Sequence, residues 1–212
     1  PTLKTFRMTG GEPLMDKNTF KVFDYVKNNP QKNLHLSITS NCCPPGNQWQ
    51  KLIDDLKQST DNDAIYHFML FCSLDSWGEQ AEYIRNGLDF DVLYKNVTQF
   101  LQESQKHSLT FIITANLLSL PNWLEYIKQI HKLRCEFNTD RQLIWFDTPM
   151  LHDPKWMSMQ LANDEMLQSL QQSIDYMKEN PETASNRFKG FKDYEVDKVK
   201  RLLDWAQQPL NT

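Results

Sequence analysis

Two adjacent glycines followed by a carboxylate and a proline stand near the start of the chain, in the stretch LKTFRMTGGEPLMDKNTF (residues 3–20). The chain has only 6 glycines among 212 residues, so the pair Gly10–Gly11 is unusual. Glycine permits a positive φ and lets a ligand touch the main chain, while Pro13 removes a backbone donor and fixes the exit from the turn. With the Glu12 carboxylate beside this exposed backbone, the turn could hold a ligand that carries both an ammonium and a carboxylate. The spacing matches neither a dinucleotide-binding glycine motif nor a phosphate-binding loop.

Five apolar runs with the pattern of strands alternate with helical patterns. Strands are expected at 3–9, 34–39, 65–74, 109–118 and 142–150. Helices are expected from Asp16 as N-cap, at 48–59, 78–85 and 90–104, from Pro121, and at 164–179 and 193–207. This alternation predicts an α/β protein with a parallel sheet, and strands that are apolar on both faces suit a sheet covered by helices or closed into a barrel. We expect residues 1–150 to form this part and residues 151–212 to form a helical extension.

Polar side chains gather where the expected strands end. They are Thr9, Glu12, Thr39, Ser40, Asn41, Ser73, Asp75, Asn116, Asp147 and Thr148. Parallel α/β proteins place their sites at the carboxyl ends of the strands, so we expect these groups to converge on one mouth. Each residue by itself could equally cap the helix that follows its strand. These strand ends contain no Lys or Arg, which favours a polar organic ligand over a polyanion.

Three of these strand ends resemble motifs of the radical S-adenosylmethionine (SAM) enzymes. TGGEPL at 9–14 is similar to their GGEP motif, ITSN at 38–41 to the end of their next strand, and CSLDSWGEQAEYIRNG at 72–87 to the strand and short helix after that. The segments 116–127 and 143–163 resemble the members of this family that carry a twitch-type domain, the truncated relative of the SPASM domain. The resemblance covers about residues 3–163.

The resemblance implies a partial (β/α)6 TIM-like barrel that binds SAM and a [4Fe-4S] iron–sulfur cluster. In such enzymes, reductive cleavage of SAM gives a 5′-deoxyadenosyl radical that takes a hydrogen atom from the substrate. By the resemblance, Gly10, Gly11, Glu12 and Pro13 would meet the methionyl amino group, and Thr39, Ser40 and Asn41 would line the same wall. Ser73 and Asp75 would lie near the carboxylate or ribose, Arg85 could pair with the carboxylate, and Asn116 is a further candidate for ribose or methionine contact.

The cysteines depart from the family's pattern. A cubane cluster needs closely grouped thiolates, and the four cysteines, Cys42, Cys43, Cys72 and Cys135, do not have the CxxxCxxC spacing. Cys42 also stands where the family usually has Gly. We therefore expect the first barrel strand and the cluster ligands upstream of Pro1 and no metal ligand within this sequence. The chain is then either a fragment of a longer enzyme, inactive without that segment, or a remnant that needs no cluster.

Composition and charge restrict the kinds of molecule that the chain is expected to bind. The net charge of −4 and the pI of about 5.7 do not favour nucleic-acid binding. The sequence contains no run of 18 apolar residues, so it does not predict a membrane span. Cysteines without a disulfide framework are typical of the reducing cytoplasm. The resemblance implies an electron donor such as flavodoxin or ferredoxin as a partner. It also implies a peptide, protein or small-molecule substrate, and we expect peptide modification as the general reaction.

Two other functions stay open. The first is a different α/β-barrel enzyme that uses Glu12, Asp75 and Asp147 as acid, base or metal ligands. The second is a degenerate, non-catalytic barrel that serves as a binding or assembly module. No catalytic acid or base is assigned.

Overall fold

The computed structural model describes residues 3–103 and 106–210. Its five strands form one parallel sheet, in the order β1-β2-β3-β4-β5. The strands are β1 (Thr5–Met8), β2 (Gln31–Ser40), β3 (Ile65–Ser73), β4 (Ser108–Ile112) and β5 (Ile144–Asp147). This confirms the α/β class and the parallel sheet.

Helices occupy the connections between the strands, as the sequence pattern predicts. They are α1 (Lys17–Asn28), α2 (Gln48–Asp61), α3 (Glu79–Ile84), α4 (Phe90–Glu103), α5 (Trp123–Phe137), α6 (Asp164–Glu179) and α7 (Asp193–Ala206). Asp16 caps α1 as expected, because its Oδ1 accepts a hydrogen bond from the backbone N–H of Asn18 at 2.8 Å. The helix that was expected to start at Pro121 begins with a 3₁₀ turn (Leu120–Asn122) that leads into α5.

Strands β4 and β5 are shorter than the apolar runs that encode them. The run 109–118 continues past β4 into a turn, where Asn116 Oδ1 accepts a hydrogen bond from the backbone N–H of Leu118 at 2.9 Å. The run 142–150 is interrupted at Pro149, which has no N–H to donate to a strand ladder. Apolar composition therefore predicts that these two segments are buried, but it does not predict where the hydrogen bonding between the strands ends.

The chain divides into two compact units, which are described separately. Unit 1 contains the residues up to Ser73 together with Leu88–Phe111, and unit 2 contains Leu74–Gly87 together with the residues from Ile112 onward. These units are defined by packing rather than by chain order. The division of the chain at residue 150 into a barrel and a helical extension stays a prediction.

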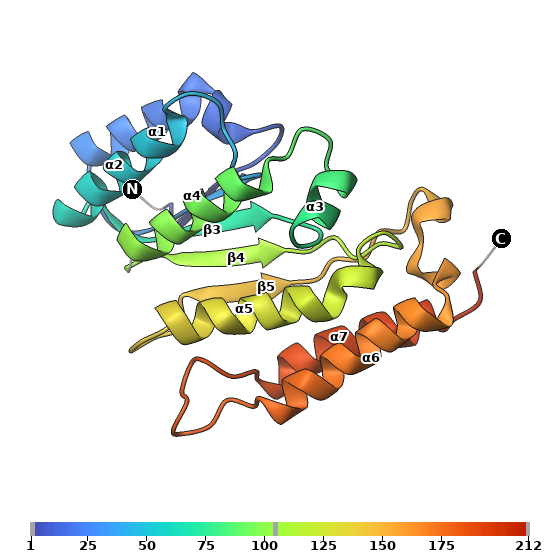
Figure 1. The fold of residues 1–212 in the computed structure, drawn as a ribbon. Coiled ribbons are helices and arrows are strands. Elements are labelled where there is room, and N and C mark those ends of the chain that lie inside the picture. Colours follow the sequence, from blue (N-terminus) through green and yellow to red (C-terminus); the bar gives the residue numbers. More distant parts are fainter. Residues whose placement is uncertain (1–2, 104–105, 211–212) are drawn as a thin grey trace. The chain divides into compact units, whose positions relative to one another are not determined.

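In unit 1, one face of the sheet is covered by helices (Figure 1). Phe68 of β3 shows which face this is, because its ring centroid lies 6.1 Å from that of Phe23 in α1 and 6.2 Å from that of Phe100 in α4. Leu36 of β2 is paired with Phe68 in the register and is fully buried with it. Side chains alternate along a strand, so the residues next to these in sequence point to the opposite face.

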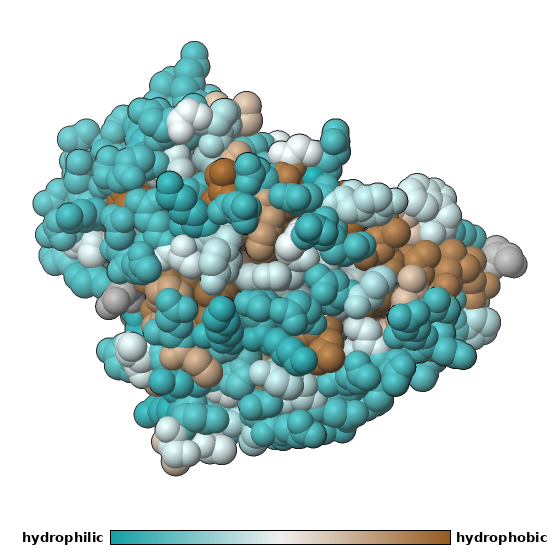
Figure 2. Space-filling view, in the orientation of Figure 1, coloured by the Kyte–Doolittle hydropathy of each residue, from teal (hydrophilic) through white to brown (hydrophobic). Residues whose placement is uncertain are grey.

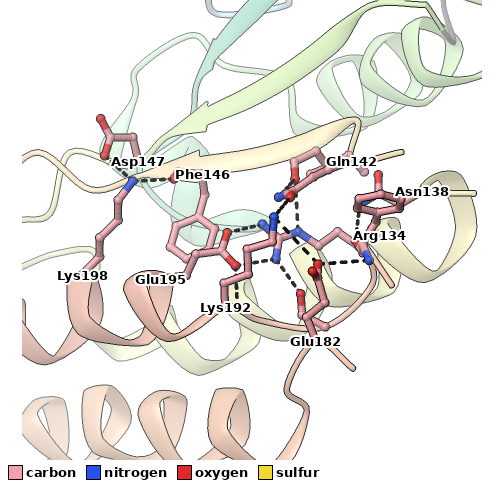
Figure 3. A network of polar contacts seen from close by, with 12 residues as sticks. Arg134, Asn138, Gln142, Phe146, Asp147, Glu182, Lys192, Glu195 and Lys198 are labelled. Carbon is pink, nitrogen blue, oxygen red and sulfur yellow. Dashed lines mark hydrogen bonds and ion pairs between the residues drawn. The ribbon is translucent and has the colours of Figure 1, made fainter. Parts of the chain in front are cut away.

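In unit 2, helix α5 is fixed to β5 and α7 by a fully buried arginine (Figure 3). Arg134 of α5 donates to both carboxylate oxygens of Glu195, at 2.6 and 3.1 Å, and to the backbone carbonyl of Ile144 at 3.2 Å. Glu195 also accepts from the backbone N–H of Lys192 at 3.0 Å. Paired, bidentate geometry of this kind is what allows two charges to be buried together.

Within residues 3–103 and 106–210, none of the helices is both long and apolar enough to cross a membrane. Figure 2 shows hydrophilic side chains over most of the visible surface, interrupted by hydrophobic patches.

Candidate functional site

The glycine turn after β1 has the conformation that its sequence predicts. Gly10 has a φ of +97° and Gly11 a φ of +56°, and both residues are exposed. A Cβ atom built at either position would meet nothing within 4 Å. The two glycines are therefore required by the backbone conformation and not by close packing, and they leave bare main chain open to a ligand.

The Glu12 carboxylate links this turn to the end of β2. Its Oε1 accepts hydrogen bonds from the Ser40 hydroxyl at 2.8 Å and from the backbone N–H of Leu14 at 3.1 Å, and its Oε2 accepts from the backbone N–H of Asn41 at 2.8 Å. A carboxylate can accept about four hydrogen bonds. Three are used here, so Glu12 is held in place and keeps one acceptor position, on Oε2, for a ligand.

The residues after Ser40 complete a second turn beside Glu12. Cys42 has a φ of +59°, a conformation that favours glycine and that residues with a side chain seldom adopt. The Ser40 hydroxyl accepts from the backbone N–H of Cys42 and the Asn41 side chain accepts from that of Cys43, both at 2.9 Å. Ser40 and Asn41 therefore shape the turn with their side chains.

The thiols of this turn are held in their neutral form. Burial raises the pKa of the Cys43 thiol to about 11, and burial likewise raises the pKa of Cys42 well above its ordinary value. Thiolates are the nucleophiles and metal ligands among cysteine forms. These two cysteines therefore have the character of structural residues.

Thr39 and Ser73 do not share a face with Ser40, which corrects the expectation of one converging mouth. Ser40 is paired with Cys72 in the register, and Thr39 is paired with Phe71. Since successive side chains on a strand point to opposite faces, Thr39 and Ser73 lie on the face away from the helices. The sequence placed polar groups at the strand ends, but the two-residue period separates them into two sets.

A second polar cluster lies in unit 2, around Asp75. This buried carboxylate accepts a hydrogen bond from Arg85 Nε at 2.8 Å through Oδ2 and from the backbone N–H of Thr114 at 2.9 Å through Oδ1. Arg85 is about one third exposed. Asp75 therefore orients the guanidinium of Arg85, whose terminal nitrogens make no hydrogen bond within the described chain.

The other candidates have local roles. Asn116 is buried, donates to the backbone carbonyl of Thr114 at 2.8 Å and accepts from Leu118, so its amide forms a turn. Pro13 is buried, and its carbonyl accepts from the Thr19 hydroxyl. Asp147 accepts from Lys198 at 2.9 Å (Figure 3).

A metal centre built from carboxylates is not favoured by this arrangement. Glu12, Asp75 and Asp147 each have a separate set of partners. Across residues 3–103 and 106–210, no group of three or more His, Cys, Asp or Glu side chains is placed to hold a metal ion. The side chains in the described part of the chain therefore do not fit a [4Fe-4S] cluster held by three cysteines.

Sequence reasoning missed one residue, Arg7. The sequence does contain a signal for it. Arg7 is a charged residue within an apolar strand pattern, and it is two positions before Thr9, so the two side chains share one face of the strand. Arg7 donates to the hydroxyl of Thr39 through Nε at 3.2 Å and Nη2 at 2.9 Å. It thus lies on the face that also carries Ser73.

Comparison with known proteins adds no assignment. No family model matches the chain, and no curated protein matches it.

Proposed function

We propose that this chain is the SAM-binding part of a radical SAM enzyme. The observation that supports the proposal is the turn at Gly10–Gly11, where exposed main chain with positive φ adjoins a Glu12 carboxylate that is fixed by Ser40 and Asn41. A fixed carboxylate next to free backbone groups suits a methionyl ammonium, because charge-assisted hydrogen bonds to an oriented acceptor are the stronger kind.

In this proposal, Glu12 binds the ammonium through its remaining acceptor position. The backbone at Gly10 and Gly11 supplies further hydrogen-bonding groups without a Cβ to exclude the ligand. Ser40 and Asn41 act through Glu12 and are positioning residues, since their hydrogen bonds go to that carboxylate and to their own turn.

The resemblance assigns Asp75 and Arg85 of unit 2 to SAM as well. Asp75 already accepts a hydrogen bond from Arg85 Nε, so we assign it the role of orienting the arginine. The terminal nitrogens of Arg85 suit the planar geometry of a carboxylate. An Arg85→Lys variant keeps the charge but loses that geometry, and it should bind SAM more weakly than the wild type.

The family's other features belong to the same proposal. Bound SAM supplies the hydrogen-abstracting radical in enzymes of this class, and this chain's residues bind and orient it. The cysteines of this chain do not fit the cluster, so its ligands are proposed to lie before Pro1 in the complete enzyme. There the five strands would belong to a partial (β/α)6 barrel that receives electrons from a flavodoxin or ferredoxin and modifies a peptide or protein.

The test uses the protein translated from the complete coding sequence, reconstituted with iron and sulfide without oxygen. Calorimetry with SAM should show saturable binding to the wild type, and a CxxxCxxC motif should precede Pro1. A Gly10→Val variant should lose binding, because a β-branched side chain at a φ of +97° distorts the turn.

Gly46→Ala is the matched control. Gly46 also has a positive φ, +66°, and an added Cβ would meet only the end of the flexible Gln48 side chain. This variant should bind SAM as the wild type does. Wild-type protein that binds iron but not SAM would refute the proposal, and protein with neither iron nor SAM would favour the non-catalytic binding module.

A further inference from the structure

The face of β1–β3 opposite the helices carries one arginine. The register places Arg7 of β1 beside Ser37 of β2 and Ser37 beside Met69 of β3. The next pair on the same face is Thr39 with Phe71. All these residues belong to unit 1, so the surface is defined within one compact unit.

The guanidinium of Arg7 is held in a fixed orientation although the residue is exposed. Its Cζ lies 4.0 Å from the centroid of the Phe71 ring. The Thr39 hydroxyl accepts hydrogen bonds from Nε and Nη2. A stacked and hydrogen-bonded guanidinium has already lost much of its rotamer freedom, so a ligand that binds it pays less of that entropy.

Arg7 keeps N–H donors that Thr39 does not use. An arginine carries five N–H donors, and Thr39 accepts two of them, which leaves three on Nη1 and Nη2. Among the residues that the structure describes, no Asp or Glu forms an ion pair with Arg7. In a chain with a net charge of −4, an oriented arginine without a carboxylate partner is available to a ligand that supplies one.

The chemistry of the face favours a carboxylate over a phosphate. On this face of β1, β2 and β3, the alternating positions hold hydroxyls, imidazoles, a thioether and an aromatic ring, but no Lys and no second Arg. A phosphate with two negative charges is typically met by several cations or a helix N-terminus. One planar guanidinium with two free terminal nitrogens instead matches a single carboxylate, and the Phe71 ring beside it offers an apolar contact to the body of the ligand.

We infer that Arg7, oriented by Thr39 and Phe71, binds the carboxylate of an organic ligand other than SAM. The inference goes beyond the proposed function and stands without it, because Arg7 can be titrated in the absence of SAM. Arg7 is the binding residue, and Thr39 is a positioning residue.

The experiment follows the side-chain NMR signals of the arginines in the isotopically labelled full chain. Benzoate is the probe, benzamide its neutral isostere, and inorganic phosphate and SAM are titrated separately at constant ionic strength. Benzoate should shift the Arg7 Nε–Hε signal saturably, and benzamide should not. The signal of Arg201, an exposed arginine of α7, should not move.

Three variants and one control variant test the assignment of the carboxylate to Arg7. Benzoate binding to the variants is measured by calorimetry, because Arg7→Met and Arg7→Lys have no Arg7 signal to follow. Arg7→Met should weaken benzoate binding by about tenfold or more, and Arg7→Lys by several-fold, because a charge-assisted bidentate contact is lost or reduced. Thr39→Val should weaken it by a few-fold while the Arg7 signal broadens. Arg201→Met should change nothing, and circular dichroism should show that all variants fold.

Three outcomes would overturn the inference. Equal shifts from benzoate and benzamide would mean that the carboxylate is not recognised. Tighter binding of phosphate than of benzoate would make this a phosphate site. A shift with SAM but none with benzoate would assign Arg7 to the methionine tail of SAM. Loss of SAM binding in Gly10→Val with benzoate binding intact would leave the inference standing, so the two proposals fail separately.

Discussion

The Ser40 hydroxyl donates a 2.8 Å hydrogen bond to the carboxylate of Glu12, which joins the end of β2 to the glycine turn after β1. Ser40 is 2% exposed, so this bond is sheltered from water. It explains how a carboxylate next to two flexible glycines is kept in one place. The roles of Glu12 in binding and of Ser40 in positioning can therefore be tested with separate mutations.

Replacing Glu12 should affect ligand binding more than folding. Glu12→Gln keeps the shape and one acceptor oxygen but removes the charge, so SAM affinity should fall by about tenfold or more. Ser40→Ala leaves Glu12 charged but removes a buried donor and an acceptor for Cys42, which should cost about 1–3 kcal/mol of unfolding free energy. Urea unfolding and calorimetry measure the two effects. Equal SAM affinity of Glu12→Gln and wild type would exclude Glu12 as the ammonium partner.

The two glycines should differ in their tolerance of alanine. Space is open at both, so the cost comes from backbone conformation alone. Gly11, with a φ of +56°, lies in the left-handed region that alanine can enter at about 1–2 kcal/mol. Gly10, with a φ of +97°, lies outside it and should lose more in Gly10→Ala. Thermal unfolding of the two variants tests this order, and a larger loss for Gly11→Ala would contradict it.

Removing one member of the buried pair Arg134–Glu195 should be more harmful than removing both. Arg134→Met leaves the Glu195 carboxylate buried without its cation and should cost about 3–5 kcal/mol. The double variant Arg134→Met/Glu195→Gln removes both charges and should recover part of that loss. Denaturant titration of the wild type, the two single variants and the double variant gives the coupling free energy. Additive losses would show that the pair is not coupled.

The cysteines should react in an order set by exposure and pKa. Exposed Cys135 should react first with iodoacetamide at pH 7.5, and buried Cys42 and Cys72 should react only after unfolding. Because the pKa of Cys43 is raised to about 11, its thiolate fraction grows about tenfold per pH unit across pH 8–10, and so should its rate. Mass spectrometry of the modified peptides follows each site. A Cys43 rate that levels off below pH 9 would mean that its thiol is not shielded.

The sequence by itself determined the order of the strands and helices. Helix α6 lies at 164–179, the range that its apolar spacing predicts, and Asp16 caps α1 as its residue type predicts. The positive φ of Gly10 and Gly11 was also readable, because adjacent glycines after a strand have few other reasons to occur. These features depend on local interactions, which neighbouring residues specify.

Only the tertiary structure decided which polar groups meet. Ser40 and Thr39 are adjacent in sequence, yet Ser40 bonds to Glu12 and Thr39 to Arg7. The pairing of Arg134 with Glu195 joins residues 61 positions apart, and no local sequence pattern predicts it. The physical reason is that strand register and helix packing are set by burial of the whole apolar surface, so the partner of a polar side chain is fixed only when distant segments are brought together.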